Sequence, residues 1–316
     1  MGLLDNYVIP QVWQDNLPFT ISEKSKLFTS DAVMRDTDPP FNKAGIYVHT
    51  PFLKEPKARW EIPSTIDLVA HKLTQNKDTM ICITRQIDYL VTKQMMRRSG
   101  VDLGKILYDN VADYVAKQYE LALIDILKAI YGPNGVLYAT HTVETDTSID
   151  FNTIFNGKSK LGDGADQLAI STYHSKVVNC LREKGMISDM FTWKEKQVET
   201  GSISKVANLP IIETDLMPKV TISNTDKYFS FLLAKDSIYF ANPYFEVETW
   251  EYPRRNGGEQ HIIITSDFCI HLPGVRYNLN VQEPTDAQLA APTTWEKIAD
   301  NDKDIKVVAL LTPIAD

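Results

Sequence analysis

Residues 166–278 decide the fold, because they combine one expected helix with a regular succession of expected strands. In chain order the segments read DQLAISTYHSKVVNCLREKG (166–185), LPIIETDLMP (209–218), YFSFLLAKDSIYF (228–240), PYFEVETWEYPRRNGG (243–258) and EQHIIITSDFCIHLPGVRYN (259–278). The clearest strand pair spans 244–271, where Asn256-Gly257-Gly258 is a turn that favours positive φ. Phe245 and Val247 alternate with Glu246 and Glu248, which indicates that one face of this hairpin meets water.

The segment 166–185 predicts a helix. It begins near Asp163 or Asp166 and ends at Gly185, which suits the position after a helix C-terminus. The expected apolar face consists of Tyr173, Val177, Cys180 and Leu181. A last strand, DIKVVALL (304–311), closes the chain.

A long helix is predicted over 105–131. This stretch contains no Gly or Pro, its apolar residues recur with a 3.6-residue period, and Gly132-Pro133 follows as a stop. About 27 residues make a rod of roughly 40 Å. Ahead of it, QIDYLVTKQMMRR (86–98) predicts a shorter helix, and the Gly-, Asn- and Thr-rich stretch 131–166 predicts a loop with short strands.

Two segments near the N-terminus predict extended structures. Residues 1–43 are polar, contain four prolines and lack a periodic face, so we expect them to lie extended over another surface. Residues 44–84 predict a long hairpin from the strands GIYVHTPFL and TMICITR. Its connecting segment alternates basic and acidic residues and contains Pro56 and Pro63, which interrupt strand pairing.

Composition excludes several classes of protein. The 316 residues are 43% hydrophobic and 23% charged, which is typical of a folded globular chain. A net charge of −8 argues against a sequence-reading nucleic-acid binder. No apolar run reaches the roughly 18 residues needed to cross a bilayer. Cys82, Cys180 and Cys269 are too widely spaced for a CxxC metal site and predict buried free thiols.

No catalytic or metal motif is intact. Gly157-Lys158-Ser159 lacks the first glycine of a phosphate-binding loop, which predicts a polar loop instead. Residues 162–164 lack the third glycine of a dinucleotide site and predict a helix N-terminus, while 300–304 lack the glycine of a calcium loop and predict a solvated turn. His174 beside Ser175 predicts a packing or capping residue, because adjacent helical side chains point about 100° apart. The aromatic residues of 228–252 predict core instead of a ligand groove.

The succession of segments, together with WEKIADNDKDIKVVALLTPIAD (295–316), resembles the major capsid proteins of tailed bacteriophages with the Hong Kong ninety-seven-like fold. The resemblance implies an α+β chain with an N-terminal arm (1–43) and an extended loop (44–84). It also implies a peripheral domain (85–133 and 242–282) with a spine helix (105–131), and an axial domain (134–241 and 283–316).

The function implied is that of a structural protein, not an enzyme, that self-assembles into the icosahedral head around double-stranded phage DNA. The residues expected to contact neighbouring subunits are Lys54, Glu55, Lys57, Arg59, Glu61 and Trp13. Implied partners are copies of the chain in hexamers and pentamers, a portal, scaffolding or decoration proteins, and DNA bound without sequence specificity. No cofactor, metal or membrane is expected. The chain would assemble in the host cytoplasm and reside in the virion.

Two alternatives stay open at this point. One is an encapsulin-like shell of the same fold that encloses a cargo protein. The other is an α+β enzyme whose site matches no known motif. Particles that hold a guest protein would favour the first, and a small monomer or dimer with turnover would favour the second.

Overall fold

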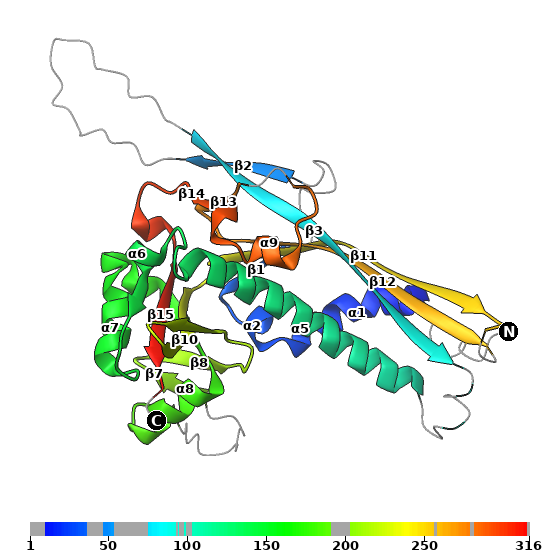
Figure 1. Ribbon diagram of the computed structural model, residues 1–316, viewed down its shortest axis with the longest axis horizontal. Coiled ribbons are helices and arrows are strands. Elements are labelled where there is room, and N and C mark those ends of the chain that lie inside the picture. The colour runs from blue at the N-terminus through cyan, green and yellow to red at the C-terminus, as the bar shows by residue number, and fades with distance from the viewer. Residues whose placement is uncertain are drawn as a thin grey trace, which may run out of the picture.

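The computed structural model describes residues 10–36, 47–53, 75–92, 94, 98, 103–190, 203–255, 258–278 and 281–314. Within them the chain is elongated (Figure 1). A long helix and a narrow sheet run side by side along one half of the molecule, and a second sheet with short helices forms a compact end. The mixed α+β class predicted from the sequence is confirmed.

The predicted long helix is confirmed as α5, Leu103–Tyr131. Its 29 residues span about 44 Å at a rise of about 1.5 Å per residue. One face, which includes Val111, Val115 and Leu123, is buried in the main core. The helix ends where predicted, because the Gly132 N–H closes the last turn on the Lys128 carbonyl at 2.9 Å.

A five-stranded sheet lies along α5 in the order β1-β11-β12-β3-β2. Its strands are β1 (Val33–Asp36), β2 (Tyr47–Leu53), β3 (Gln75–Thr92), β11 (Ile238–Tyr252) and β12 (Glu259–His271). The predicted hairpin is confirmed as β11–β12, paired antiparallel from Tyr239↔His271 to Tyr252↔Glu259. We call the three long strands β11, β12 and β3 the ribbon.

The helix expected over 86–98 is wrong for its first half. Residues up to Thr92 continue β3, which pairs antiparallel with β12 from Cys82↔Cys269 to Thr92↔Glu259. Ile83, Ile87, Tyr89 and Val91 alternate with polar or exposed neighbours and pack on the core, so the period is two residues and not 3.6.

The compact end contains an eight-stranded sheet in the order β4-β15-β10-β5-β8-β7-β6, with β9 also paired to β10. The bounds are β4 (Thr142–Glu144), β5 (Leu168–Tyr173), β6 (Ser188–Met190), β7 (Ile203–Val206), β8 (Leu209–Glu213), β9 (Lys219–Ile222), β10 (Thr225–Ala234) and β15 (Val307–Pro313). The helices here are α6 (Tyr138–His141), α7 (Phe151–Ser159), α8 (Ser175–Glu183) and the 3-10 turn η1 (Gly162–Gln167).

Two expectations in the compact end need correction. The predicted helix 166–185 splits into η1, strand β5 and helix α8, because Leu168–Tyr173 pairs with β10 and β8. Gly185 does end the helix, at φ +64°. The loop predicted over 131–166 contains α7, whose N-terminus is capped by Asp150 accepting from the Thr153 N–H at 2.7 Å.

The N-terminal segment also differs from expectation. Within residues 1–43, Pro10–Lys24 forms helix α1 and Lys26–Thr29 forms α2, instead of an extended arm. Trp13, Leu17 and Ile21, spaced four residues apart, are buried in the main core. One apolar residue per turn and an internal Pro18 make the helical period weak in the sequence.

The remaining elements connect the two sheets. They are β13 (Val275–Tyr277), α9 (Asp286–Leu289), η2 (Pro292–Thr294), β14 (Trp295–Lys297) and η3 (Asp302–Asp304), with β13 and β14 paired antiparallel.

Candidate intersubunit surfaces

The predicted long hairpin is present as a two-stranded stem. β2 and β3 pair antiparallel from Tyr47↔Ile81 to Leu53↔Gln75. In Figure 1 this stem projects from the body at the end opposite the β11–β12 turn. Lys54, Glu55, Lys57, Arg59 and Glu61, the residues predicted to contact a neighbour, lie outside the described residues, so their role stays a prediction.

The middle of the stem, where Asp78 pairs with Thr50, is fixed to the body by a buried polar contact. His271 Nε2 at the end of β12 lies 3.0 Å from Asp78 Oδ2 on β3, and both side chains are buried. The Gly274 N–H donates to the same oxygen at 3.3 Å. A buried carboxylate held by two partners restricts how the stem can move relative to the end of β12.

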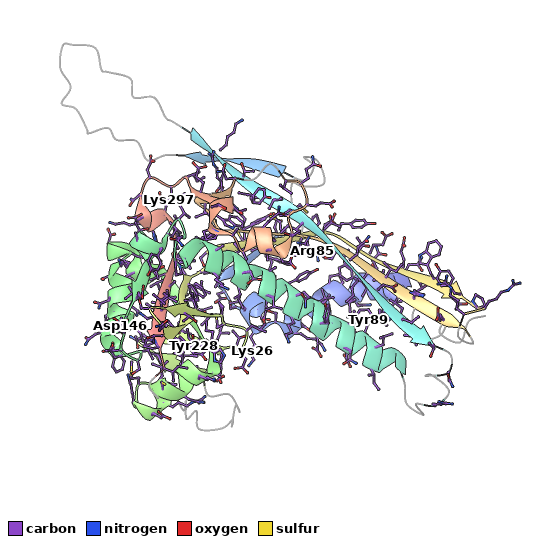
Figure 2. The ribbon with its side chains drawn as sticks, in the orientation of Figure 1. Lys26, Arg85, Tyr89, Asp146, Tyr228 and Lys297 are labelled. Carbon is purple, nitrogen blue, oxygen red and sulfur yellow. The ribbon has the colours of Figure 1, made fainter. Side chains whose placement is uncertain are left out.

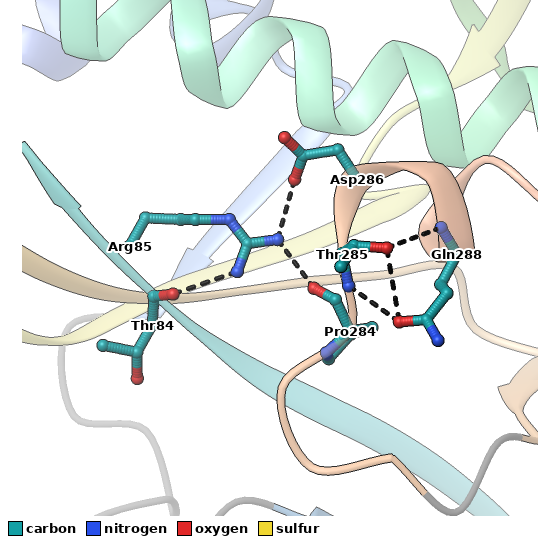
Figure 3. Close-up of polar contacts among 6 residues, drawn as sticks. All are labelled: Thr84, Arg85, Pro284, Thr285, Asp286 and Gln288. Atoms are coloured by element: carbon teal, nitrogen blue, oxygen red, sulfur yellow. Dashed lines mark hydrogen bonds and ion pairs between the residues drawn. The ribbon is translucent and has the colours of Figure 1, made fainter.

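A second contact ties β3 to α9 (Figure 3). Arg85 Nη2 donates to the Pro284 carbonyl at 2.8 Å and to Asp286 Oδ1 at 2.7 Å, and Arg85 Nη1 donates to the Thr84 carbonyl at 3.0 Å. The start of α9 is itself ordered by a capping box between Thr285 and Gln288. We call this group the Arg85 clamp, and it joins the ribbon to the connection that leads into the compact end.

Beside the clamp, a cavity of about 310 Å³ lies between α5 and the sheet. Its polar lining includes Arg85, Asp125 and the hydrogen-bonded pair Tyr119 and Ser266. Burial raises the pKa of Asp125, Asp286 adds to the rise, and Lys128 opposes it. Arg85 is held by Asp286 at the edge of this cavity, and burial raises the pKa of Tyr119.

The face of the ribbon opposite α5 is an exposed strip of aromatic and acidic side chains. The register places Trp250, His261 and Leu90 in one row and Glu248, Ile263 and Asp88 in the next. Trp250 is 54% exposed and Leu90 is 49% exposed. On the α5 side, by contrast, Tyr89 packs edge-on against Tyr114 at 6.4 Å, and Figure 2 shows Tyr89 on β3 near α5.

We call Tyr244, Glu246, Glu248, Trp250 and Tyr252 with Leu90 the outer ribbon face. Past Ala241, no strand within the described residues pairs with the free edge of β11. The exposed glutamates were predicted, but the prediction that the aromatic residues of 228–252 form core is wrong for Tyr244, Trp250 and Tyr252. These three residues share the alternating positions of Glu246 and Glu248, so they face solvent with them. Exposed rings on a stiff, protruding strand pair favour contact with another macromolecule.

Comparison with known proteins shows the family of the chain. Residues 53–308 match the model of the Gp13-like family, described as major capsid protein 13-like. The chain belongs to this family of major capsid proteins. The match covers most of the chain, so the protein is a structural component of a phage head and resides in the virion.

Solved structures show the same fold at low sequence identity. This capsid protein is similar to the capsid of Ralstonia phage GP4, at 13% identity and a TM-score of 0.58, over 91% of this chain and 89% of that one. It is similar to the head structure of Helicobacter pylori bacteriophage KHP40, at 12% identity and a TM-score of 0.59, over 92% and 91% of the two chains. It is also similar to the acidic stable capsid of Helicobacter pylori bacteriophage KHP30, at 10% identity and a TM-score of 0.58, over 92% of each chain. No curated protein matches the sequence.

Trp13, the remaining residue predicted to contact a neighbour, is packed inside the capsid protein's own core. It is 5% exposed and its ring meets Tyr108 of α5 edge-on at 5.2 Å. In the single chain it therefore joins α1 to α5, and it offers little surface to another subunit.

A second exposed aromatic pair lies on α7 of the compact end. Phe151 and Phe155, four residues apart, stack on each other with ring centroids 6.4 Å apart, and both are largely exposed. The sequence reading assigned this stretch to a loop and so missed the pair.

His174 and Ser175, considered above as a possible base and nucleophile, have structural roles. His174 caps α8 by accepting from the Lys176 N–H at 3.1 Å, as predicted. Contrary to the expectation that adjacent side chains diverge, His174 Nδ1 lies 3.4 Å from Ser175 Oγ, because His174 precedes the helix. Since that nitrogen already accepts the Lys176 N–H, it does not activate the hydroxyl.

The other motif fragments are also absorbed by the fold. Gly157-Lys158-Ser159 ends helix α7 and is not a loop, and Gly157 packs against Leu310. Asp302 pairs with Lys297, which lowers the pKa of that carboxyl. Among the described residues no group of His, Cys, Asp and Glu could hold a metal ion, and no helix is long and apolar enough to cross a bilayer.

Proposed function

We propose that this major capsid protein is the repeating subunit of an icosahedral head that encloses double-stranded phage DNA. The observation that supports it is a long, stiff body with an anchored β2–β3 stem at one end and an exposed aromatic ribbon at the other, in a chain of the capsid family. An elongated subunit with contact surfaces at both ends can tile a closed wall, and many modest interfaces then reinforce one another.

The residues that reach between subunits are proposed to lie on the stem and the ribbon. Lys54, Glu55, Lys57, Arg59 and Glu61 follow β2 in the sequence, and the outer ribbon face offers glutamates and aromatic rings. In the same proposal, 85–133 and 242–282 form a peripheral domain, and 134–241 and 283–316 form an axial domain around the capsomer axes.

Further partners follow from the same proposal. Copies of the chain form hexamers and pentamers, and a portal, scaffolding or decoration proteins complete the head. With a net charge of −8, the wall encloses DNA without gripping its sequence. The proposal assigns no enzymatic activity to the chain.

Electron microscopy of the purified protein, alone and with the products of neighbouring genes, tests the proposal. Closed shells with local five- and six-fold capsomers are expected, and they should admit DNA when packaging components are present. A stable monomer or dimer under all assembly conditions would overturn the proposal, and shells that hold a guest protein would favour the encapsulin-like alternative.

A charge-reversal variant tests the role of the stem. Changing Lys54, Lys57 and Arg59 to Glu should leave the monomer folded, because exposed ion pairs contribute only about 0–1 kcal/mol each. Shell yield should fall sharply. A matched control reverses Lys26, Lys117 and Lys306, three exposed lysines on the body. Normal shells from the stem variant, or equal loss in both variants, would contradict a specific role for the stem.

A further inference from the structure

Two of the three cysteines, 187 positions apart in the sequence, are direct neighbours across the ribbon. Cys82 of β3 and Cys269 of β12 are register partners in antiparallel strands. Side chains of such partners point to the same face of a sheet, here the face opposite α5. The two cysteines form a small apolar cluster with Met80, Ala241 and Tyr239.

The backbone geometry of this position suits a disulfide. Opposite residues in antiparallel strands have Cα atoms about 4.5–5.5 Å apart, within the roughly 4.4–6.8 Å that a disulfide bridges. Their Cβ atoms lie about 4.5–5.5 Å apart, so closing to the roughly 3.5–4.5 Å of a disulfide needs a shift of about 1 Å. Both thiols are free in this structure.

We propose that Cys82 and Cys269 form an intramolecular cross-strand disulfide when the protein meets a small-molecule disulfide. The Cys82 thiolate attacks one sulfur of the oxidant, whose S–S bond breaks and releases one thiol. The Cys269 thiolate then attacks Cys82 Sγ, forms the Cys82–Cys269 bond and releases the second thiol. Two protein thiols are thus oxidised while one small disulfide is reduced to two thiols.

The order of the two steps follows from exposure. Cys82 is half-buried, whereas Cys269 is fully buried, so an external disulfide reaches Cys82 and not Cys269. Cys269 is then the resolving residue. Cys180 is buried in a different cluster, with Val177 and Leu181, and has no cysteine partner among the described residues.

The environment of the pair makes the reaction slow at neutral pH. Burial raises the pKa of Cys82 to about 12, and the charge of Asp267 adds to the rise. Burial also raises the pKa of Cys269 far above its ordinary value, and Cys82 adds to that rise. Because only the thiolate attacks, the rate of oxidation should rise about tenfold per pH unit between pH 7 and pH 9.

The bond would lie where β3 changes its pairing partner from β2 to β12. In chain order Cys82 is the first residue of β3 that pairs with β12, and the preceding residue, Ile81, pairs with β2. A disulfide there would act together with the Asp78–His271 contact, which holds β3 four residues away. On the proposed function, the thiols stay reduced in the cytosol, and the bond forms after the head leaves it.

Treatment of the purified subunit with oxidised glutathione at pH 9 tests the proposal. The count of free thiols after denaturation should fall from three to one, without a glutathione adduct and without a covalent dimer. Peptide mapping should find Cys82 joined to Cys269, and the urea midpoint of unfolding should rise until a reductant is added. This readout does not depend on shell formation, so its failure leaves the proposed function untouched.

Two variants separate the pair from general thiol oxidation. Cys180→Ala should still lose both remaining thiols. Cys82→Ser, at the half-buried site, should keep both of its thiols under the same treatment. A stable glutathione adduct on Cys82 of the wild type, a covalent dimer, or three free thiols in a folded protein that oxidises once unfolded would each overturn the proposal.

Discussion

The compact sheet and the ribbon bury their strands in opposite ways. In the compact sheet, all seven residues of β15 are buried, and alternate residues enter different cores: Val307, Ala309 and Leu311 the main core, and Val308 and Leu310 the second. The ribbon packs one face on α5 and leaves Tyr244, Trp250 and Tyr252 exposed on the other. The compact sheet therefore contributes buried core on both faces, whereas the ribbon extends from the body and exposes one of its faces.

The two regions also differ in how they hold their carboxylates. In the compact end, Lys227 and Tyr138 lower the pKa of Glu144, and the Thr153 hydroxyl and N–H lower that of Asp150. Along α5, burial raises the pKa of Asp125. Lowering the pH should therefore reduce the stability contributed by Glu144 and Asp150 in the compact end. Protonation of Asp125 should instead remove the cost of burying its charge.

The largest expected effect comes from the core of the compact sheet. Phe231 is fully buried and lies between Phe229, stacked at 5.7 Å, and Tyr131 at 6.0 Å. Phe231→Ala should lower the free energy of unfolding by about 3–5 kcal/mol, because it leaves a cavity. Urea unfolding measures this change, and a loss below about 1 kcal/mol would contradict the two-core description.

Next in size is the buried lysine of β10. Lys227 Nζ lies 2.6 Å from both Glu144 Oε1 and Asp146 Oδ1, and Figure 2 places Asp146 at the outer side of the compact end. Lys227→Met should cost about 1–3 kcal/mol, less than for a fully buried pair, because Asp146 is 94% exposed and can be hydrated. In the variant, the pKa of Glu144 should rise, which NMR titration would detect. An unchanged pKa would show that the pair is not formed.

A smaller loss is expected at the cap of α7. Asp150→Ala removes the acceptor for the Thr153 N–H and should cost about 0.5–2 kcal/mol. A carboxyl with a lowered pKa stabilises the fold above its unfolded pKa, and this contribution disappears as the pH falls through the folded value. The difference in stability between wild type and variant should thus shrink below about pH 4. A difference that stays constant down to pH 2 would argue against the cap.

The expected pH dependence of stability has the opposite sign at Asp125, whose pKa is raised by burial. A carboxyl with a raised pKa favours the fold below its unfolded pKa and opposes it once the pH rises through the folded value. Asp125→Asn should accordingly raise stability at pH 7, by less than about 1 kcal/mol, and the gain should vanish near pH 4. Thermal unfolding at both pH values checks this. A loss of stability at pH 7 would mean that the charge makes a favourable contact.

The sequence predicted those parts whose patterns are strong and local. The 3.6-residue period of α5, the alternation of β11 and β12 and the stop at Gly132 were all confirmed. Helix α1 was missed because Trp13, Leu17 and Ile21 show only one apolar residue per turn. β5 was missed because LAISTY precedes a true helix and became a strand only through its pairing with β10 and β8.

The candidate surfaces were predicted less well than the fold. Exposure of Trp250 and burial of Trp13 depend on which strands and helices pack together, and composition does not determine that. Cys82 and Cys269 are neighbours because of the pairing register between β3 and β12, and these two residues are 187 positions apart in the sequence. Such long-range juxtapositions follow from tertiary packing, so local patterns could not predict them.

The smallest expected effect on folding comes from the outer ribbon face, where the comparison between the two regions is sharpest. Trp250 is more than half exposed, and its indole N–H donates to Glu248 Oε2 at 3.3 Å on the same strand. Trp250→Ser should change stability by less than about 0.5 kcal/mol, in contrast to Phe231→Ala. If the outer ribbon face is an interface, the same change should reduce shell yield, because exposed aromatic residues are common anchors of protein contacts.

Phe155→Ser on α7 is the matched control, since it removes an equally exposed ring from the compact end. Sedimentation of assembled particles and the urea midpoint are measured on both variants. Loss of shells only for Trp250→Ser would assign the contact to the ribbon, whereas normal shells from that variant would show that the ribbon supplies length and stiffness but not the anchor.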